Sequence, residues 1–144
     1  MNIGIDMMGG DFAPLEAVKG IALFLGQTNT SIQFTLIGDE HAIKELLPLH
    51  KVQLTNIDIV HAAQVIGMHE HPTKALKEKP ASSIAIGFKL LATGKIDAFI
   101  SAGNTGAMLV GALFSIKAIE GVSRPTIGAY IPREDGQLGL LLDA

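Results

Sequence analysis

The chain alternates between short apolar runs and longer segments in which apolar residues recur every three or four positions. The apolar runs lack two-residue alternation, which is typical of strands buried on both faces. The runs that predict strands are 2–6, 32–39, 57–61, 96–103, 126–132 and 138–143. The segments with helical periodicity are 11–27, 40–48, 82–94 and 104–121. Strands that alternate with helices in this way predict an α/β fold whose sheet is covered by helices on both faces.

Polar residues mark the expected starts of these helices. Asp11 is a candidate N-cap of the first helix, because its side chain can accept a hydrogen bond from a free backbone N–H. Ser82 or Ser83 can cap the third helix, and Asn104 or Thr105 the fourth.

No linker, internal repeat or low-complexity segment divides the chain, so residues 1–144 are expected to form a single α/β domain. Segment 64–79 is the least regular part and predicts a loop with one or two helical turns. The sequence ends in "GQLGLLLDA", a strand-like run with no turn or polar tail after it. Because the last residues of a domain are usually exposed, this ending predicts that the chain is the N-terminal portion of a longer one.

Composition and charge exclude several classes of function. The absence of cysteine rules out disulfides, thiolate zinc sites and a cysteine nucleophile within these 144 residues. The net charge is -3 without a long basic run, so nucleic acid is not an expected ligand. The N-terminus has no basic region and does not fit a signal peptide. The longest uncharged apolar stretch, 107–116, is shorter than the about 20 residues of a membrane span. A cytoplasmic protein is therefore expected.

Three loops that contain glycine follow predicted strands: "DMMGGDFAP" at 6–14, "IGDE" at 37–40 and "SAGNTGA" at 101–107. In open α/β sheets, ligands bind beyond the carboxyl ends of the strands. Glycine allows a ligand to approach the backbone, and a helix N-terminus offers free N–H groups to an anion. The loops match neither the P-loop nor the G-x-G-x-x-G pattern, so a nucleotide is not indicated. The loop at 101–107 therefore remains either a capped turn or an anion site.

Asp6 and Asp11 flank the glycine pair Gly9 and Gly10. Two carboxylates at this spacing could bind Mg²⁺, but turn formation and capping explain them more simply. The segment "HEHP" at 69–72 is interpreted as a surface loop, because histidines two positions apart share a face only in a strand. No metal site and no cofactor are expected.

Lysine is concentrated in one segment, where Lys74, Lys77 and Lys79 lead into the serine pair Ser82 and Ser83. The segment fits a solvated loop before a helix cap, or a second anion site at the start of that helix. A G-x-S-x-G elbow is absent, so a hydrolase triad has little support.

These segments occur in the same order and spacing in a known family. "DMMGGDFAP", "LIGDE", "LKEKPASSIAIGFKLLATGKIDAFISAGNTGAML", "RPTIGAYIP" and "LLLDA" make the whole sequence similar to the phosphate acyltransferases, the PlsX family of acyl-acyl carrier protein:phosphate acyltransferases. The combination of "KPASS" with "SAGNTGA" is the most specific part of this resemblance. The family chain is longer, so the sequence resembles its N-terminal part, and a further glycine-containing turn of the family is missing here.

The resemblance implies an enzyme that transfers a fatty acyl group from acyl-acyl carrier protein to inorganic phosphate, giving acyl phosphate for phospholipid synthesis. It implies a three-layer α/β/α sandwich resembling isocitrate and isopropylmalate dehydrogenases, here incomplete at the C-terminus. It also implies a homodimer. Peripheral association with the inner face of the membrane would come from a segment later in the family chain.

The resemblance also suggests roles for individual residues. Phosphate can attack a thioester directly, so the protein has to hold the reactants together and stabilise an oxyanion. Asn104 and Lys79 are the candidate catalytic residues. The candidate phosphate- and substrate-binding residues are Gly103, Thr105, Gly106, Ser82, Ser83, Lys77, Asp6, Gly9, Gly10 and Asp11. The acidic carrier protein would meet the lysines of 74–79.

Three other functions stay open from the sequence. A phosphotransacylase of related fold would use coenzyme A in place of the carrier protein. A metal-dependent dehydrogenase of that fold is less favoured, because no dinucleotide fingerprint is present. A non-catalytic binding or dimerisation module would also fit a truncated chain.

Overall fold

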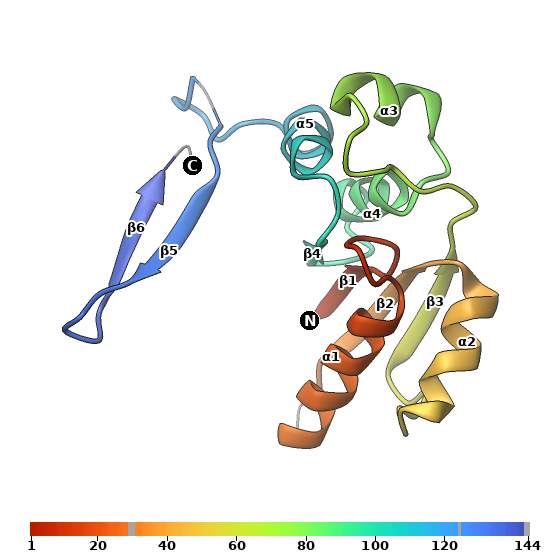
Figure 1. Cartoon of the computed structure of the whole chain (residues 1–144). Helices are drawn as coiled ribbons and strands as arrows, with labels where there is room; N and C mark the ends of the chain where they lie inside the picture. Colours follow the sequence, from red (N-terminus) through yellow and green to blue (C-terminus); the bar gives the residue numbers. More distant parts are fainter. Residues whose placement is uncertain (29–30, 124, 143–144) are drawn as a thin grey trace.

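The computed structural model describes residues 1–28, 31–123 and 125–142, and its main unit is a small parallel sheet with helices on both sides (Figure 1). Arg124, Asp143 and Ala144, which belong to segments named above, lie outside the described residues. The strands are β1 (Asn2–Asp6), β2 (Gln33–Gly38), β3 (Ile57–His61), β4 (Ala98–Ile100), β5 (Gly128–Pro132) and β6 (Leu138–Leu142). The helices are α1 (Leu15–Gln27), α2 (Glu40–Leu49), α3 (Pro72–Glu78), α4 (Ser83–Ala92) and α5 (Thr105–Ser115).

The parallel sheet has the strand order β3-β2-β1-β4. In its register, Ile5 of β1 lies between Leu36 of β2 and Ile100 of β4. The predicted α/β class is thus confirmed, and the sheet is parallel. The strands expected at 2–6 and 57–61 have the observed bounds, whereas β4 is shorter than its predicted range of 96–103.

Each face of the sheet carries its own apolar cluster. Ile3 and Ile5 of β1 and Phe34 and Leu36 of β2 belong to a cluster that α1 and α2 cover. Gly4, which lies between Ile3 and Ile5 in the strand, faces the ring of Phe99 on the opposite side. That side is covered by α4, which contacts β1, β2 and β4. The described part of the chain therefore has three layers, as helices on both faces of a parallel sheet require.

The strand order reverses at β1. The chain runs from β1 to β2 and β3 on one side, and then crosses to place β4 on the other side of β1. Because all four strands are parallel, β1 and β4 end side by side at Asp6 and Ile100. Ligands of open α/β sheets bind at such a reversal. A ligand site is therefore expected at the loops that follow these two strands.

Several helix ends differ from the predicted ones. The first helix begins at Leu15, and Asp11 does not cap it: Pro14 holds the cap position without a side-chain hydrogen bond. The caps expected at Ser82 and Asn104 are confirmed. The last helix stops at Ser115, well before 121, because Lys117 has a φ of 65°, a left-handed conformation that ends a helix.

The last two strands do not join the parallel sheet, contrary to the prediction of one sheet. β5 and β6 form an antiparallel hairpin that extends away from the parallel sheet on the far side of α5 (Figure 1). Tyr130 and Leu140 face each other across it and are 75% and 61% exposed. A two-stranded hairpin has too little neighbouring surface to bury such residues.

The apolar helix expected near 107–116 corresponds to α5. It has 11 residues, and no helix among the described residues has the length and apolarity needed to cross a membrane. Its residues Ala107 and Gly111 are buried. Gly111 lies so close to Phe88 of α4 that a Cβ there would overlap the ring. The side of α5 that carries these residues therefore packs in the core.

Candidate functional site

The loops after β1 and β4 are in backbone contact. A Cβ built on Gly9 would lie 2.5 Å from the amide nitrogen of Gly103 and 2.8 Å from Oδ2 of Asp6. No real Cβ tolerates these distances, so glycine is required at position 9 by close approach. The structure thus brings together two of the three glycine loops that the sequence singled out.

Asp6 holds both of these loops. Its side chain is 3% exposed, with Oδ1 accepting the Met8 N–H at 2.9 Å and Oδ2 accepting the Ser101 hydroxyl at 2.7 Å. The Ser101 Oγ in turn accepts the N–H of Gly103 at 2.9 Å. One buried carboxylate therefore connects the end of β1 to the turn that follows β4.

Asn104 is the N-cap of α5, and hydrogen bonds hold both the oxygen and the nitrogen of its side-chain amide. Its Oδ1 accepts the N–H of Ala107 at 2.9 Å, which caps the helix. Its Nδ2 donates to the carbonyls of Gly67, Met68 and Glu70 at 3.0, 3.2 and 3.0 Å. The side chain is 4% exposed and is directed into the protein. Its capping role is the one that the geometry supplies, and a direct contact with a ligand remains a prediction.

The first turn of α5 leaves backbone donors free. The N–H groups of Thr105 and Gly106 have no hydrogen-bond partner among the described residues, whereas the N–H of Gly103 is taken by Ser101. Gly106 lies against Pro72 so closely that a Cβ there would overlap the proline ring. Free N–H groups at the positive end of a helix favour an anion.

Lys79 folds back onto the loop that Asn104 holds. Its Nζ donates to the Val65 carbonyl at 2.8 Å and to Oε1 of Glu70 at 2.5 Å, while the same Oε1 accepts the Gly67 N–H at 2.6 Å. The Lys79 hydrogen bond, together with the Gly67 N–H, holds the pKa of Glu70 below its ordinary value. The positive charge of Lys79, a candidate catalytic residue, is thus partnered within the protein.

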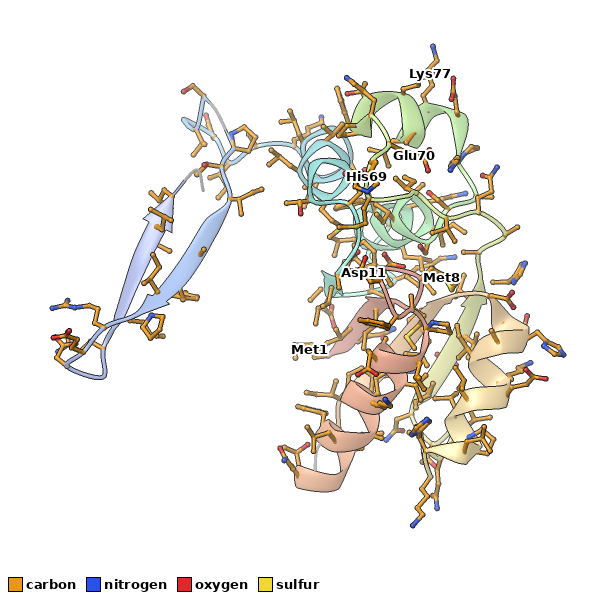
Figure 2. All side chains as sticks on the ribbon, viewed as in Figure 1. Met1, Met8, Asp11, His69, Glu70 and Lys77 are labelled. Carbon is orange, nitrogen blue, oxygen red and sulfur yellow. The ribbon has the colours of Figure 1, made fainter. Side chains whose placement is uncertain are left out.

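The remaining lysine and serine candidates are one exposed and two buried residues. Lys77 is exposed on α3 and extends away from the rest of the molecule (Figure 2). Ser82 and Ser83 are 0% and 1% exposed, and the Ser82 Oγ caps α4 by accepting the N–H of Ala85. None of these three residues is among those that line the pocket beside the glycine loops, and their contact with a substrate stays a prediction.

A pocket of about 330 Å³ opens where the two glycine loops leave the sheet. Asp11 is exposed at its edge, in the loop before α1 (Figure 2). No group of three or more His, Asp or Glu side chains within the described ranges is arranged to hold a metal ion. The residues that line the pocket are Ile5, Asp6, Gly9, Gly10, Asp11, Phe12, Ala13, Glu16, Ala17, Ile100, Ser101 and Ala102.

Three polar or aromatic residues of this region were missed from the sequence. Ser101 is the first residue of "SAGNTG", and a serine two residues before a glycine is a known turn signal that could have identified it. Phe12, in the loop before α1, and Glu16, in the first turn of α1, also line the pocket. Neither has a local pattern that would have marked it as part of a site.

Comparisons with known proteins agree on a family for this chain. The model of a family described as "fatty acid synthesis protein" matches residues 1–144. Phosphate acyltransferases are similar to the chain: that of Dictyoglomus turgidum is 44% identical over 143 residues, covering 99% of this chain and 42% of the relative. That of Acetivibrio thermocellus is 44% identical over 144 residues, covering 100% and 42%. The chain thus spans about two-fifths of the length of the curated relatives it matches.

A solved structure has a similar fold. The EutD phosphotransacetylase from Staphylococcus aureus matches with a TM-score of 0.62 at 22% identity, over 96% of this chain and 44% of that one. At this identity the likeness concerns the fold alone.

Proposed function

The chain belongs to the fatty acid synthesis protein family, whose similar members are phosphate acyltransferases, and on that premise we propose that it transfers an acyl group from a thioester to inorganic phosphate. The observation that carries the proposal is the contact of Gly9 with the Gly103 amide at the point where the strand order reverses. We propose that the anion site lies here, because residues of both glycine loops line one pocket and the loop after β4 continues into the N-terminus of α5.

In the proposed reaction an oxygen of phosphate attacks the thioester carbonyl carbon. A C–O bond forms, the C–S bond breaks, and the sulfur leaves as a thiolate that takes up a proton from solvent. The protein contributes orientation of the two reactants and stabilisation of the oxyanion, without a covalent intermediate. The N–H groups of Thr105 and Gly106 are the donors that we assign to phosphate or to the oxyanion.

We propose side-chain roles that follow from the hydrogen bonds of each residue. We assign Asn104 to positioning, because its amide is committed to the helix cap and to loop 67–70. We assign Lys79 to the same loop through Glu70. Asp6, Gly9 and Gly10 shape the site from the facing loop.

We propose acyl-acyl carrier protein as the donor. Lys74 and Lys77 on α3 have exposed side chains, and an acidic carrier would be attracted to such cations. We further propose that residues 1–144 are the N-terminal portion of a homodimeric cytoplasmic enzyme that is peripheral to the inner face of the membrane. Its complete fold would be the three-layer sandwich of the isocitrate and isopropylmalate dehydrogenases.

The fold of the EutD phosphotransacetylase favours a second candidate, transfer from acyl-coenzyme A. The deciding experiment supplies the full-length protein with inorganic phosphate and either acyl-acyl carrier protein or acyl-coenzyme A. Acyl phosphate is trapped with hydroxylamine and the free thiol is titrated. We expect phosphate-dependent thiol release that is faster with the carrier protein. Faster release with coenzyme A would favour the second candidate, and release without phosphate would contradict acyl transfer to phosphate altogether. Binding of phosphate without thiol release would favour the non-catalytic module.

A further inference from the structure

Ser101 occupies the junction between the two glycine loops. It is the first residue after β4, and its hydroxyl donates to Oδ2 of Asp6 at 2.7 Å across 95 positions of sequence. The same oxygen accepts the Gly103 N–H at 2.9 Å, which forms the tight turn leading to α5. The direction of this turn is therefore fixed by a residue of β1.

The Asp6 carboxylate controls two turns at once. Through Oδ1 it closes the turn at Met8 that leads into Gly9 and Gly10, and through Oδ2 it orients the Ser101 hydroxyl. Hydrogen bonds to a charged acceptor are stronger than neutral ones, and burial at 3% exposure shields this one from water. A substitution of Ser101 is therefore expected to change the conformation of the loop after β1.

The two loops have little room to adjust independently. Gly103 has its Cβ position 3.2 Å from Oδ2 of Asp6 and 3.3 Å from a side-chain atom of Ile84, and Gly9 lies against its amide. We propose that Ser101 is a positioning residue: its hydroxyl, held by Asp6, sets the contact of the glycine loops and the turn into α5, and so the affinity of the first N–H groups of α5 for phosphate. This inference rests on the proposed function for its ligand, and on the geometry alone for the coupling of the loops.

The first test measures binding of inorganic phosphate to the full-length protein by isothermal titration, comparing wild type with Ser101→Ala, Ser101→Thr and Ser115→Ala. Ser101→Ala is expected to weaken binding on the order of tenfold, as for the loss of one hydrogen bond to a charged group. Ser101→Thr keeps the hydroxyl and should restore most of the affinity. Ser115 is the last residue of α5, and its substitution should leave the affinity unchanged.

The second test asks whether the loops are coupled. In amide NMR spectra, Ser101→Ala should shift the resonances of Met8 and Gly9 as well as that of Gly103. Asp6→Asn should shift the same amides, and the double variant should weaken phosphate binding little more than either single one, because the two residues act as a unit.

These measurements separate the positioning role from the activity. If the wild type binds phosphate but makes no acyl phosphate, the proposed function fails, and the inference still stands or falls on the Ser101 variants. Unchanged phosphate affinity in Ser101→Ala would overturn the inference, as would shifts confined to residues 101–104. Loss of binding that follows a fall in melting temperature and is not restored by threonine would show a purely structural role and would also overturn it.

Discussion

Two strand-to-helix junctions of this molecule have the same local motif, a glycine followed by the residue that caps the helix. They differ in the contacts that the cap residue makes. β2 leads through Gly38 to Asp39, which caps α2, and β4 leads through Gly103 to Asn104, which caps α5. Asp39 is exposed, and its Oδ1 accepts the N–H groups of His41 and Ala42 at 2.9 and 3.2 Å. Asn104 is buried and also ties the distant loop 67–70 to its helix.

The difference teaches that the strand order, and not the local motif, decides which loops come into contact. At the first junction the two neighbours of β2 in the sheet, β1 and β3, are the strands just before and just after it in the chain, and Gly38 lies against the side chain of Met8. At the second junction β4 lies across the reversal of the sheet, so its loop meets the backbone of another glycine loop. Four predictions test this contrast, from the largest expected effect to the smallest.

Removing the two caps should give unequal losses of stability. Asn104→Ala leaves three carbonyls and one N–H without their partner, and we expect it to lower the free energy of unfolding by about 2–4 kcal/mol. Asp39→Ala removes only an exposed cap and should cost about 1 kcal/mol. Urea denaturation of both variants checks this, and equal losses would mean that the contacts to loop 67–70 contribute nothing.

Replacing one glycine at each junction by alanine should lower both stability and activity, and by different amounts at the two junctions. Gly9→Ala meets the backbone of Gly103 and should cost about 1–3 kcal/mol of stability and about 100-fold in kcat/KM for phosphate. Gly38→Ala meets mainly the flexible side chain of Met8, at 3.0 Å, and should cost less on both counts. Thermal denaturation and steady-state kinetics measure the two effects. A Gly9→Ala variant with wild-type kinetics would disprove the close approach.

The acid sensitivity of the junctions should differ through Glu70 and Glu40. The pKa of each is lowered, Glu70 by Lys79 and the Gly67 N–H, and Glu40 by Lys44. A depressed pKa stabilises the folded state above the ordinary pKa of glutamate, and this contribution is lost as the pH falls through the folded pKa. The effect of Glu70→Gln on the melting temperature should therefore be present at pH 7 and disappear toward pH values below about 4.

Glu40→Gln is the matched control for that pH series. It removes an exposed pair within α2 and breaks no contact to another loop, so it should lower the melting temperature less than Glu70→Gln at pH 7. Both differences from wild type should vanish in acid. A Glu70→Gln effect that persists at low pH would contradict a role for its charge.

The smallest effect is expected in the hairpin, which belongs to neither junction. Leu140 is 61% exposed, so Leu140→Thr should change the free energy of unfolding by no more than about 0.5 kcal/mol. Buried Leu36 of β2 is the contrast, since Leu36→Ala should cost about 2–5 kcal/mol. A large effect at Leu140 would show that the hairpin is covered in solution.

Local sequence patterns predicted the features that are determined by residues close to one another in the chain. Helix caps at Ser82 and Asn104 and the bounds of β1 and β3 follow from side chains and periodicity within a few residues. The hairpin of β5 and β6 was not predicted, because the same apolar runs are compatible with strands of a parallel sheet and with strands that pair only with each other. The direction of the Asn104 amide and the hydrogen bond from Ser101 to Asp6 depend on segments far away in the chain. No local pattern contains them.

The contact between Gly9 and the Gly103 amide limits how this sequence can diverge. Neither loop can gain a side chain at these positions unless the other recedes, and a receding loop would break the hydrogen bonds that converge on Asp6. Substitutions at Asp6, Gly9, Ser101 and Gly103 are therefore expected to be tolerated in combination rather than singly. Two segments separated by most of the chain form one epistatic unit, and recombination between related genes that exchanged only one of them would disrupt the site.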